Sequence, residues 1–188
     1  MTKRAFRLRA ISSIVGSAVM IATPAIAADA IFLNLLDVQG ESTESGHAKE
    51  IVVDSYSQSV SNSAAFATGG GSTVGKASCG DIVITKRIDK SSPALIMKVL
   101  TGAVIPSGQL SFRRIANYIS QDYYTVQLTG ISITAVEQND GPANPSGVME
   151  LIKLKARTFR LTYTPQTPDG SLSTPQTFGF DCSTNQRL

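Results

Sequence analysis

Asp81 to Thr101 reads Asp-Ile-Val-Ile-Thr-Lys-Arg-Ile-Asp-Lys-Ser-Ser-Pro-Ala-Leu-Ile-Met-Lys-Val-Leu-Thr, and its hydrophobic period changes in the middle. The first part, Asp81 to Ile88, alternates apolar and polar side chains and predicts a half-buried strand. The second part predicts a short helix over 92–101, with Ser92 as N-cap, Pro93 at the first helical position and Gly102 just past the end. Its buried stripe is expected to contain Leu95, Ile96, Val99 and Leu100.

The rest of the chain is typical of an antiparallel β protein. Apolar and polar residues alternate in several segments bounded by Gly, Pro, Asn and Ser. The predicted strands are Ala30–Asp37, Glu50–Ser59, Asp81–Ile88, Gln109–Arg114, Tyr123–Gln138, Met149–Thr164 and Gln176–Asp181. Strict alternation puts Ala135 on the face of Ile133 and Val136 on the opposite face. These strands and one helix indicate a mainly β fold, a small barrel or sandwich with one short α-helix on its flank.

The first twenty-seven residues have the pattern of a secretory signal peptide. A basic start precedes an apolar run from Ala10 to Ala22, and Ala25 and Ala27 fit the small-residue rule for cleavage. A membrane anchor is the alternative, but spanning a bilayer needs about 20 apolar residues, and serine and glycine interrupt this shorter run. We therefore expect residues 1–27 to be a Sec-type signal peptide, cleaved after Ala27. One domain, 28–188, is then secreted or periplasmic, with no stable membrane insertion.

Removal of that segment changes the charge of the chain. It holds four of the seventeen Lys and Arg residues and none of the fourteen Asp and Glu residues, so thirteen basic and fourteen acidic residues remain. A nearly neutral domain lacks the basic footprint of proteins that bind nucleic acid. We therefore expect no nucleic-acid partner.

Two cysteines, Cys79 and Cys182, are present. In an oxidising compartment thiols pair, which favours a disulfide between them. The bond would close a loop of about 100 residues, for which chain entropy allows up to about 4.7 kcal/mol. Two separate buried thiols are the alternative, whereas a CxxC redox pair is excluded because no second cysteine lies nearby in sequence.

Two segments read as loops, Ser59–Ala77 and Asn139–Gly147. Loops of this length in a compact domain usually bind partners or move. The first contains three successive glycines and then Gly75-Lys76, but the residue after Lys76 is alanine and the phosphate-loop pattern fails.

The single histidine, His47, is the one residue that could support an enzyme or metal site. Four carboxylates lie near it in sequence: Asp37, Glu41, Glu44 and Glu50. One histidine with scattered carboxylates is more often a solvated or hydrogen-bonded surface group. A Gly-x-Ser-x-Gly nucleophile elbow is also absent. We expect no catalysis, metal or cofactor.

Several blocks carry a specific resemblance. They are Phe32–Leu35, Asp37–Ser42 followed by His47 and Glu50–Ile51, Ile84–Pro93, Leu110–Arg114, Phe159–Gln166 and Thr177–Asp181. In these blocks the chain resembles the haemolysin-coregulated protein (Hcp) family, the tube proteins of the bacterial type VI secretion system. The resemblance implies a split antiparallel β-barrel that assembles as a homohexameric ring, with ring stacking and small effector proteins in the lumen.

The resemblance also implies where copies meet. By this analogy the glycine-rich loop reaches the adjacent ring, and the segment before the helix lies toward the lumen or the subunit boundary. The expected interface residues are Ser59, Phe66, Gly69, Gly70, Gly71, Lys76, Asp89, Lys90, Ser91, Ser92 and Pro93.

The signal peptide departs from this family pattern, because tube proteins assemble in the cytoplasm beside their sheath. One explanation is a shorter product that begins at Met20. The other is an exported relative that keeps the fold. The predicted function is therefore a ring-forming tube or effector-carrier component of type VI secretion, or such an exported relative. A monomeric secreted or periplasmic binding module on the same barrel is the alternative.

Overall fold

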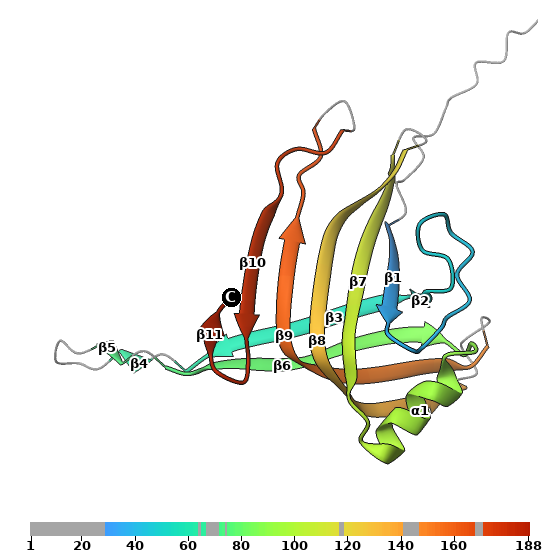
Figure 1. The fold of residues 1–188 in the computed structure, drawn as a ribbon, viewed down its shortest axis with the longest axis horizontal. Helices are drawn as coiled ribbons and strands as arrows, with labels where there is room; N and C mark the ends of the chain where they lie inside the picture. The colour runs from blue at the N-terminus through green and yellow to red at the C-terminus, as the bar shows by residue number, and fades with distance from the viewer. Residues whose placement is uncertain are drawn as a thin grey trace, which may run out of the picture.

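Two long, bent strands organise the fold (Figure 1). The structure is a computed structural model that describes residues 29–63, 65–66, 72–73, 75–116, 119–140, 147–167 and 171–188. Its strands are β1 (Asp29–Leu35), β2 (Ile51–Val53), β3 (Ser55–Asn62), β4 (Ala65–Phe66), β5 (Ser72–Thr73), β6 (Ala77–Arg87), β7 (Ile105–Ala116), β8 (Ile119–Asn139), β9 (Met149–Tyr163), β10 (Gln176–Asp181) and β11 (Gln186–Arg187), and its helix is α1 (Ser92–Thr101). The mainly β fold with one short helix agrees with the sequence prediction.

The bent strands β8 and β9 belong to two layers. They pair with each other over most of their length. The first half of β9 also pairs with β6, and its second half pairs with β10. An upright layer therefore follows the order β11-β10-β9-β8-β7-β1-β2, while β6 and β3 branch off β9 into a second layer that crosses below it (Figure 1). This arrangement is a split antiparallel barrel.

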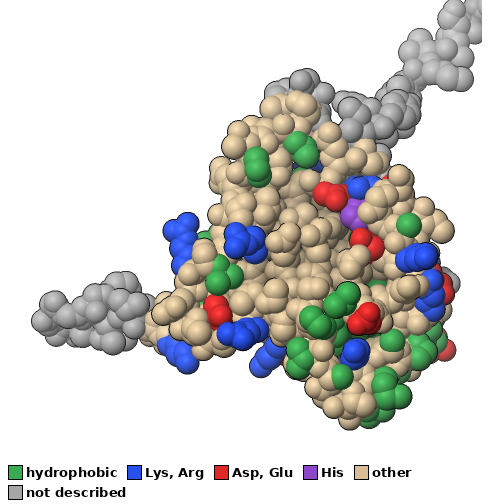
Figure 2. All heavy atoms as spheres, in the orientation of Figure 1, with side chains coloured by type: hydrophobic (Ala, Val, Ile, Leu, Met, Phe, Trp, Pro, Cys, Tyr) green, Lys and Arg blue, Asp and Glu red, His purple; other side chains and the backbone are tan. Residues whose placement is uncertain are grey.

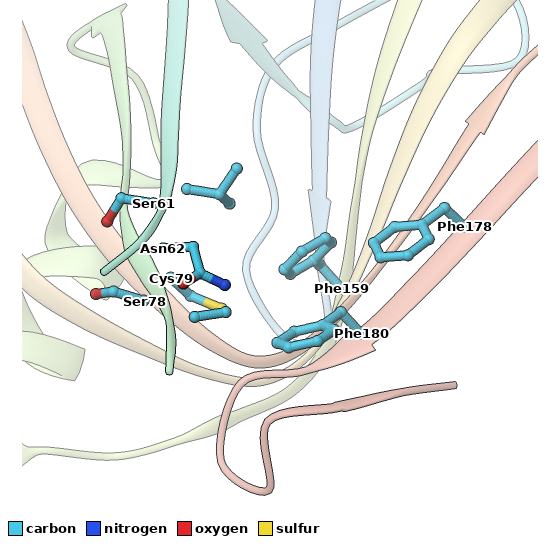
Figure 3. A pocket seen from close by; sticks show the side chains of 9 residues that line it. Ser61, Asn62, Ser78, Cys79, Phe159, Phe178 and Phe180 are labelled. Atoms are coloured by element: carbon cyan, nitrogen blue, oxygen red, sulfur yellow. The ribbon is translucent and has the colours of Figure 1, made fainter. Parts of the chain in front are cut away.

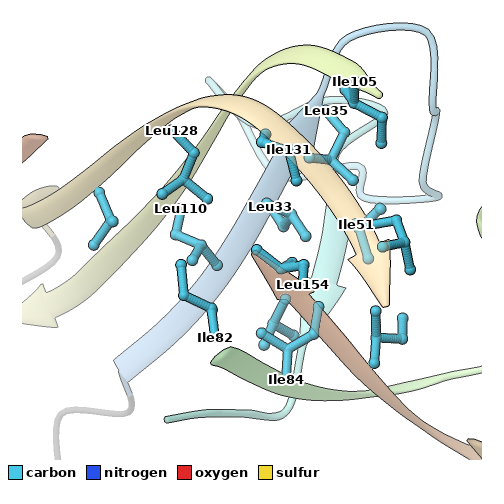
Figure 4. Close-up of a cluster of buried hydrophobic side chains, with 14 of the residues drawn as sticks. Leu33, Leu35, Ile51, Ile82, Ile84, Ile105, Leu110, Leu128, Ile131 and Leu154 are labelled. Carbon is cyan, nitrogen blue, oxygen red and sulfur yellow. The ribbon is translucent and has the colours of Figure 1, made fainter. Parts of the chain in front are cut away.

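The core fills the space between the layers (Figure 4). Alternate residues of each strand point inward, so that Ile82 and Ile84 of β6 and Ile152 and Leu154 of β9 are buried. Leu33, Leu110 and Leu128 of the upright layer meet them from above. All seven side chains are at most 2% exposed, so the centre of the barrel is closed.

The predicted strands all occur, with some changes of extent. β7 begins earlier than expected, at Ile105, and the predicted glycine-rich loop carries the end of β3 together with β4 and β5. The pairing of β8 with β9 shifts register between Ile133 and Ala135. Because a bulge breaks strict alternation, Val136 packs against the core, and the prediction that it faces away was wrong.

Helix α1 differs from its prediction at its start and in its buried stripe. The N-cap is Ser91, and Ser92 is already helical. Gly102 ends the helix in the left-handed region (φ 64°), as predicted. Leu95 is buried and Val99 packs partly against the core, but Leu100 is 76% exposed. The prediction that Leu100 is buried was therefore wrong.

The prediction that the protein is exported depends on the sequence of the N-terminal segment. The predicted signal peptide, residues 1–27, lies outside the described residues. No helix in the described ranges is long and apolar enough to cross a membrane.

Candidate functional site

A buried ion pair seals the end of the barrel beside α1. The inward alternation of β6 continues from Ile82 and Ile84 to Lys86, and Glu150 lies directly opposite Lys86 on β9. Both side chains are 0% exposed, and the Lys86 Nζ lies 2.7 Å from the Glu150 Oε2. The alternation along β6 and the alternation along β9 thus bring a lysine and a glutamate to the same point of the core.

Hydrogen bonds from α1 and β8 complete this network. The Ser92 hydroxyl donates to Glu150 at 2.6 Å, and the Gln138 amide donates to its other oxygen at 2.7 Å. Lys86 also donates to the Asp89 carboxylate at 2.8 Å. Burial raises the pKa of Glu150, but the hydrogen bonds from Lys86, Ser92 and Gln138 outweigh it and hold the pKa below the ordinary value. The carboxylate therefore stays ionised and ties α1 to the barrel.

This network occupies part of the predicted interface segment. Ser91 is 0% exposed and Ser92 is 3% exposed, so both serve the interior of their own protomer. Asp89 is bound by Lys86. Only Lys90 and Pro93 of this segment have exposed side chains.

The other residues of the predicted interface belong to the glycine-rich loop of the sequence prediction or to its ends. Ser59 is exposed on β3, at the register shift against β6, and Lys76 is exposed just before β6. Phe66 belongs to β4, which pairs with β5. Gly69, Gly70 and Gly71 lie outside the described residues.

His47 is buried between two carboxylates. Its side chain is 4% exposed and stacks on Phe32 with ring centroids 4.4 Å apart. The Nδ1 lies 2.8 Å from Glu50 and the Nε2 lies 3.1 Å from Asp122. Figure 2 shows this side chain in purple beside acidic groups. The expectation of a surface histidine was wrong, because the ring stacks on Phe32 and its Nε2 contacts Asp122, which lies 75 residues away in sequence.

Arg113 also connects Asp122 to the segment that contains His47. Its Nε donates to Asp122 at 2.8 Å, and its Nη1 donates to the carbonyl of Ser45 at 2.6 Å. His47 and Arg113 together fasten the segment before β2 to β7 and β8. Since each nitrogen of His47 faces a carboxylate, neither is free to bind a metal or take a proton from a substrate. Across the described ranges no group of three or more His, Cys, Asp and Glu residues is placed to hold a metal ion.

A disulfide holds the opposite side of the barrel, as predicted. It joins Cys79 of β6 to Cys182, which follows β10, with Cα atoms 6.0 Å apart and a sequence separation of 103. The bond therefore ties the C-terminal strands of the upright layer to the lower layer, where β3 and β10 do not pair.

An apolar hollow, the trough, lies beside this disulfide (Figure 3). A cavity of about 310 Å³ is lined by Val60, Ser61, Asn62, Ala77, Ser78, Cys79, Phe159, Phe178 and Phe180. A second cavity of about 300 Å³ shares Val60, Phe159 and Phe178 with it. Figure 3 shows the three phenylalanines facing Asn62 and Cys79 across the hollow. Val60 is 66% exposed and Phe178 is 43% exposed, so the protomer leaves this apolar surface open to solvent.

A row of hydroxyl side chains crosses four strands of the upright layer. Ser111, Thr125, Thr162 and Thr177 lie opposite one another across four strands. Farther along β9 the basic side chains have acidic neighbours, with Lys153 2.9 Å from Glu137. Thr177 is exposed and Thr125 and Thr162 are partly exposed, whereas Ser111 is only 1% exposed. The β8–β10 part of this row therefore presents hydroxyl groups to solvent.

Comparisons with known proteins agree with this geometry. The family model described as type VI secretion system effector, Hcp, matches residues 32–165. The protein hcp1 of Pseudomonas aeruginosa is 30% identical over 141 residues, which cover 75% of this chain and 86% of that protein. A structure described as a type six secretion system protein superposes with a TM-score of 0.80 at 22% identity, covering 86% of this chain and 100% of the other.

A second solved structure, Hcp1 from Salmonella typhimurium, has a TM-score of 0.70 and is 25% identical, covering 86% of this chain and 99% of its own. The matched region includes the Lys86–Glu150 network and the cluster of His47, Glu50, Asp122 and Arg113, which we call the His47 clamp. From the family model and the P. aeruginosa relative together, we conclude that this chain belongs to the Hcp family of the type VI secretion system.

Proposed function

We propose that this protein is a ring-forming component of the type VI secretion tube, or an exported relative of it, and that it acts as a homohexamer. The observation that carries the proposal is the pair of apolar surfaces left open at opposite ends of the protomer. One is the trough, and the other lies on and beside α1, where Met97, Leu100 and Val104 are more than half exposed. Large exposed apolar patches mark protein interfaces, and two different patches suit a cyclic assembly.

The row of hydroxyl side chains on the upright layer supports a hollow ring. If the apolar ends are covered by neighbouring copies, Thr125, Thr162 and Thr177 stay in contact with water. Small effector proteins in a lumen lined in this way would meet hydroxyl groups and paired charges. The β4–β5 arm and its flanking residues Ser59 and Lys76 extend from the protomer (Figure 1) and are proposed to reach the next ring in a stack.

We place the mature chain outside the cytoplasm. The predicted signal peptide over 1–27 supports this, and so does the Cys79–Cys182 disulfide, since such bonds persist in oxidising compartments. Intact mass of the protein from the periplasm and the medium tests it. A chain that begins at Ala28 and resists alkylation is expected, whereas a chain that retains residues 1–27 would contradict export through Sec.

The experiment for assembly is light scattering on a sizing column, with the chain from Ala28 to Leu188 in oxidising buffer. A particle of about six chain masses is expected for a closed ring. The alternative function, a monomeric binding module on the same barrel, is favoured by the export signal and predicts one chain mass at every concentration. The proposed function includes no catalytic step.

A further inference from the structure

Helix α1 is apolar on both of its faces. Leu95 and Val99 pack against the core of the barrel, and only Ser92 on this side joins the polar Lys86–Glu150 network. On the other side Pro93, Met97 and Leu100 follow one another at spacings of four and three, and so share one face of the helix. We call these three residues the helix stripe.

The helix stripe is unusually exposed for its composition. Met97 is 58% exposed and Leu100 is 76% exposed, and Lys98 is the only charged residue of α1. A helix that is apolar all round is normally buried all round. Figure 2 shows apolar side chains gathered over the part of the molecule where α1 lies. In a single protomer the outer apolar face of α1 is therefore left uncovered.

The trough has the complementary shape and chemistry. It is concave, whereas the helix stripe is convex, and no residue that lines it is charged. Seating apolar side chains there would therefore bury no charged lining residue, and the Arg187 guanidinium lies 5.9 Å from the centroid of the Phe178 ring. Its walls are three phenylalanines, and aromatic residues are enriched in the cores of interfaces.

The two surfaces lie at opposite ends of the protomer. In Figure 1, α1 is at the lower right, and β3 and β10, which line the trough, reach the left side. When one surface of a chain fits a different surface of the same chain, copies join head to tail and close into a ring if the rotation allows. A second copy of this chain is therefore an occupant that the structure itself supplies.

We propose that the helix stripe of one copy docks into the trough of the next copy, so that each junction is built from two copies. This inference rests on the proposed ring and adds its polarity and its contact residues. Leu100 is the most exposed of the large apolar side chains of the helix stripe, at 76%, and Phe178 lines both cavities of the trough.

Two variants test the junction. Leu100→Lys places a charge on the helix stripe, where a cation near the helix C-terminus does not oppose the helix dipole, and Phe178→Lys places one in the trough. Each is expected to weaken the junction by about 30-fold or more, as loss of an interface hot spot does. Val52→Lys is the matched control, because Val52 is 48% exposed on β2 and outside both surfaces. It is expected to keep the ring.

Mixing the two variants tests polarity. Leu100→Lys copies keep an intact trough, and Phe178→Lys copies keep an intact helix stripe. An equimolar mixture is therefore expected to form a one-to-one dimer that cannot grow, while each variant alone is monomeric by light scattering. Far-UV circular dichroism checks that both variants fold like the wild type.

The results separate this inference from the proposed function. A wild-type monomer would overturn both. A wild-type ring that persists in both variants, or that persists in Leu100→Lys alone, would overturn the docking while the ring stands. Photo-crosslinking from benzoylphenylalanine at position 100 gives a second measurement that needs no disruptive variant. A crosslink to the peptide that contains Phe178–Phe180 of another copy is expected, and crosslinks only elsewhere would overturn the docking.

Discussion

The two ends of the barrel are closed by different means. At the α1 end the protomer satisfies its own groups, because the Lys86–Glu150 pair is fully buried and bound by residues of α1 and β8. His47 forms a second polar clamp, between the segment before β2 and β8. At the trough end β3 and β10 do not pair, a disulfide replaces strand pairing, and Phe178 remains exposed.

Under the proposed ring, this difference separates the residues that serve the fold from those that serve assembly. Buried polar groups that are completely satisfied rigidify one conformation, and they leave nothing for a partner. An apolar surface that is left open contributes nothing to the free protomer and is expected to contribute when a partner covers it. Changes at the first kind of site should therefore alter unfolding, and changes at the second kind should alter association.

The largest loss of stability is expected from Lys86→Met. It leaves Glu150 buried without its cation, which costs about 3–5 kcal/mol of unfolding free energy. Urea denaturation at a fixed protein concentration measures it, because assembly links stability to concentration. The control Lys153→Met removes a partly exposed pair with Glu137 and should cost less than about 1 kcal/mol. Equal losses in the two variants would show that the Lys86 network does not hold α1.

The double variant Lys86→Met/Glu150→Leu sharpens this prediction. Replacing both charges removes the unpaired carboxylate, so the double variant should be more stable than Lys86→Met alone. If the double variant instead loses as much unfolding free energy as the two single variants together, the pair acts through something other than burial of a charge.

The next largest effect is expected at the trough end. Replacement of Cys79 and Cys182 by serine should lower the unfolding free energy by about 2–4 kcal/mol, since the bond closes a long loop in the unfolded chain. Reduction of the wild type in the same buffer is the matched comparison. A bond that only bridges flexible ends would give no change in the urea midpoint in either case.

A smaller effect is expected from the His47 clamp. His47→Phe keeps an aromatic ring against Phe32 but removes both nitrogens, so that Glu50 and Asp122 lose their shared partner. We expect a loss of about 1–3 kcal/mol, with faster amide exchange in the segment 38–50. Unchanged exchange there would contradict the role of His47 as a clamp.

The smallest effect is expected from the exposed pair of Asp29 and Arg114. The hydrogen bond from Arg114 holds the pKa of Asp29 below its ordinary value. Stability from this pair is therefore present above the unfolded carboxyl pKa of about 3.9 and is lost as the pH falls through the folded pKa. Asp29→Asn should cost less than about 1 kcal/mol at pH 7, and the difference from the wild type should vanish near pH 2. A difference that persists in acid would show that the charge is not the cause.

Local patterns predicted much of the fold. Alternation located the main strands, the Ser-Pro start and Gly102 located α1, and the two cysteines together with the predicted signal peptide predicted the disulfide. Each of these signals depends on neighbouring residues or on composition, so one sequence suffices to read it.

Features that depend on register between distant strands were missed. Lys86 and Glu150 share the inward face only because β6 pairs with β9 at that register. The signal that could have found them is the continuation of Ile82 and Ile84 to a lysine, and of Leu154 and Ile152 back to a glutamate. The burial of His47 depends on Asp122, which lies 75 residues away. The trough could not be predicted, because it exists where two strands fail to pair.

The most direct test of the central claim is native mass spectrometry of the oxidised chain from Ala28 to Leu188, without crosslinker and at micromolar concentration. Our account predicts a dominant species of six chains, each with its Cys79–Cys182 bond intact. A single chain as the dominant species, or a dimer that does not grow with concentration, would contradict the claim that the open ends of this barrel are built to join copies into a ring.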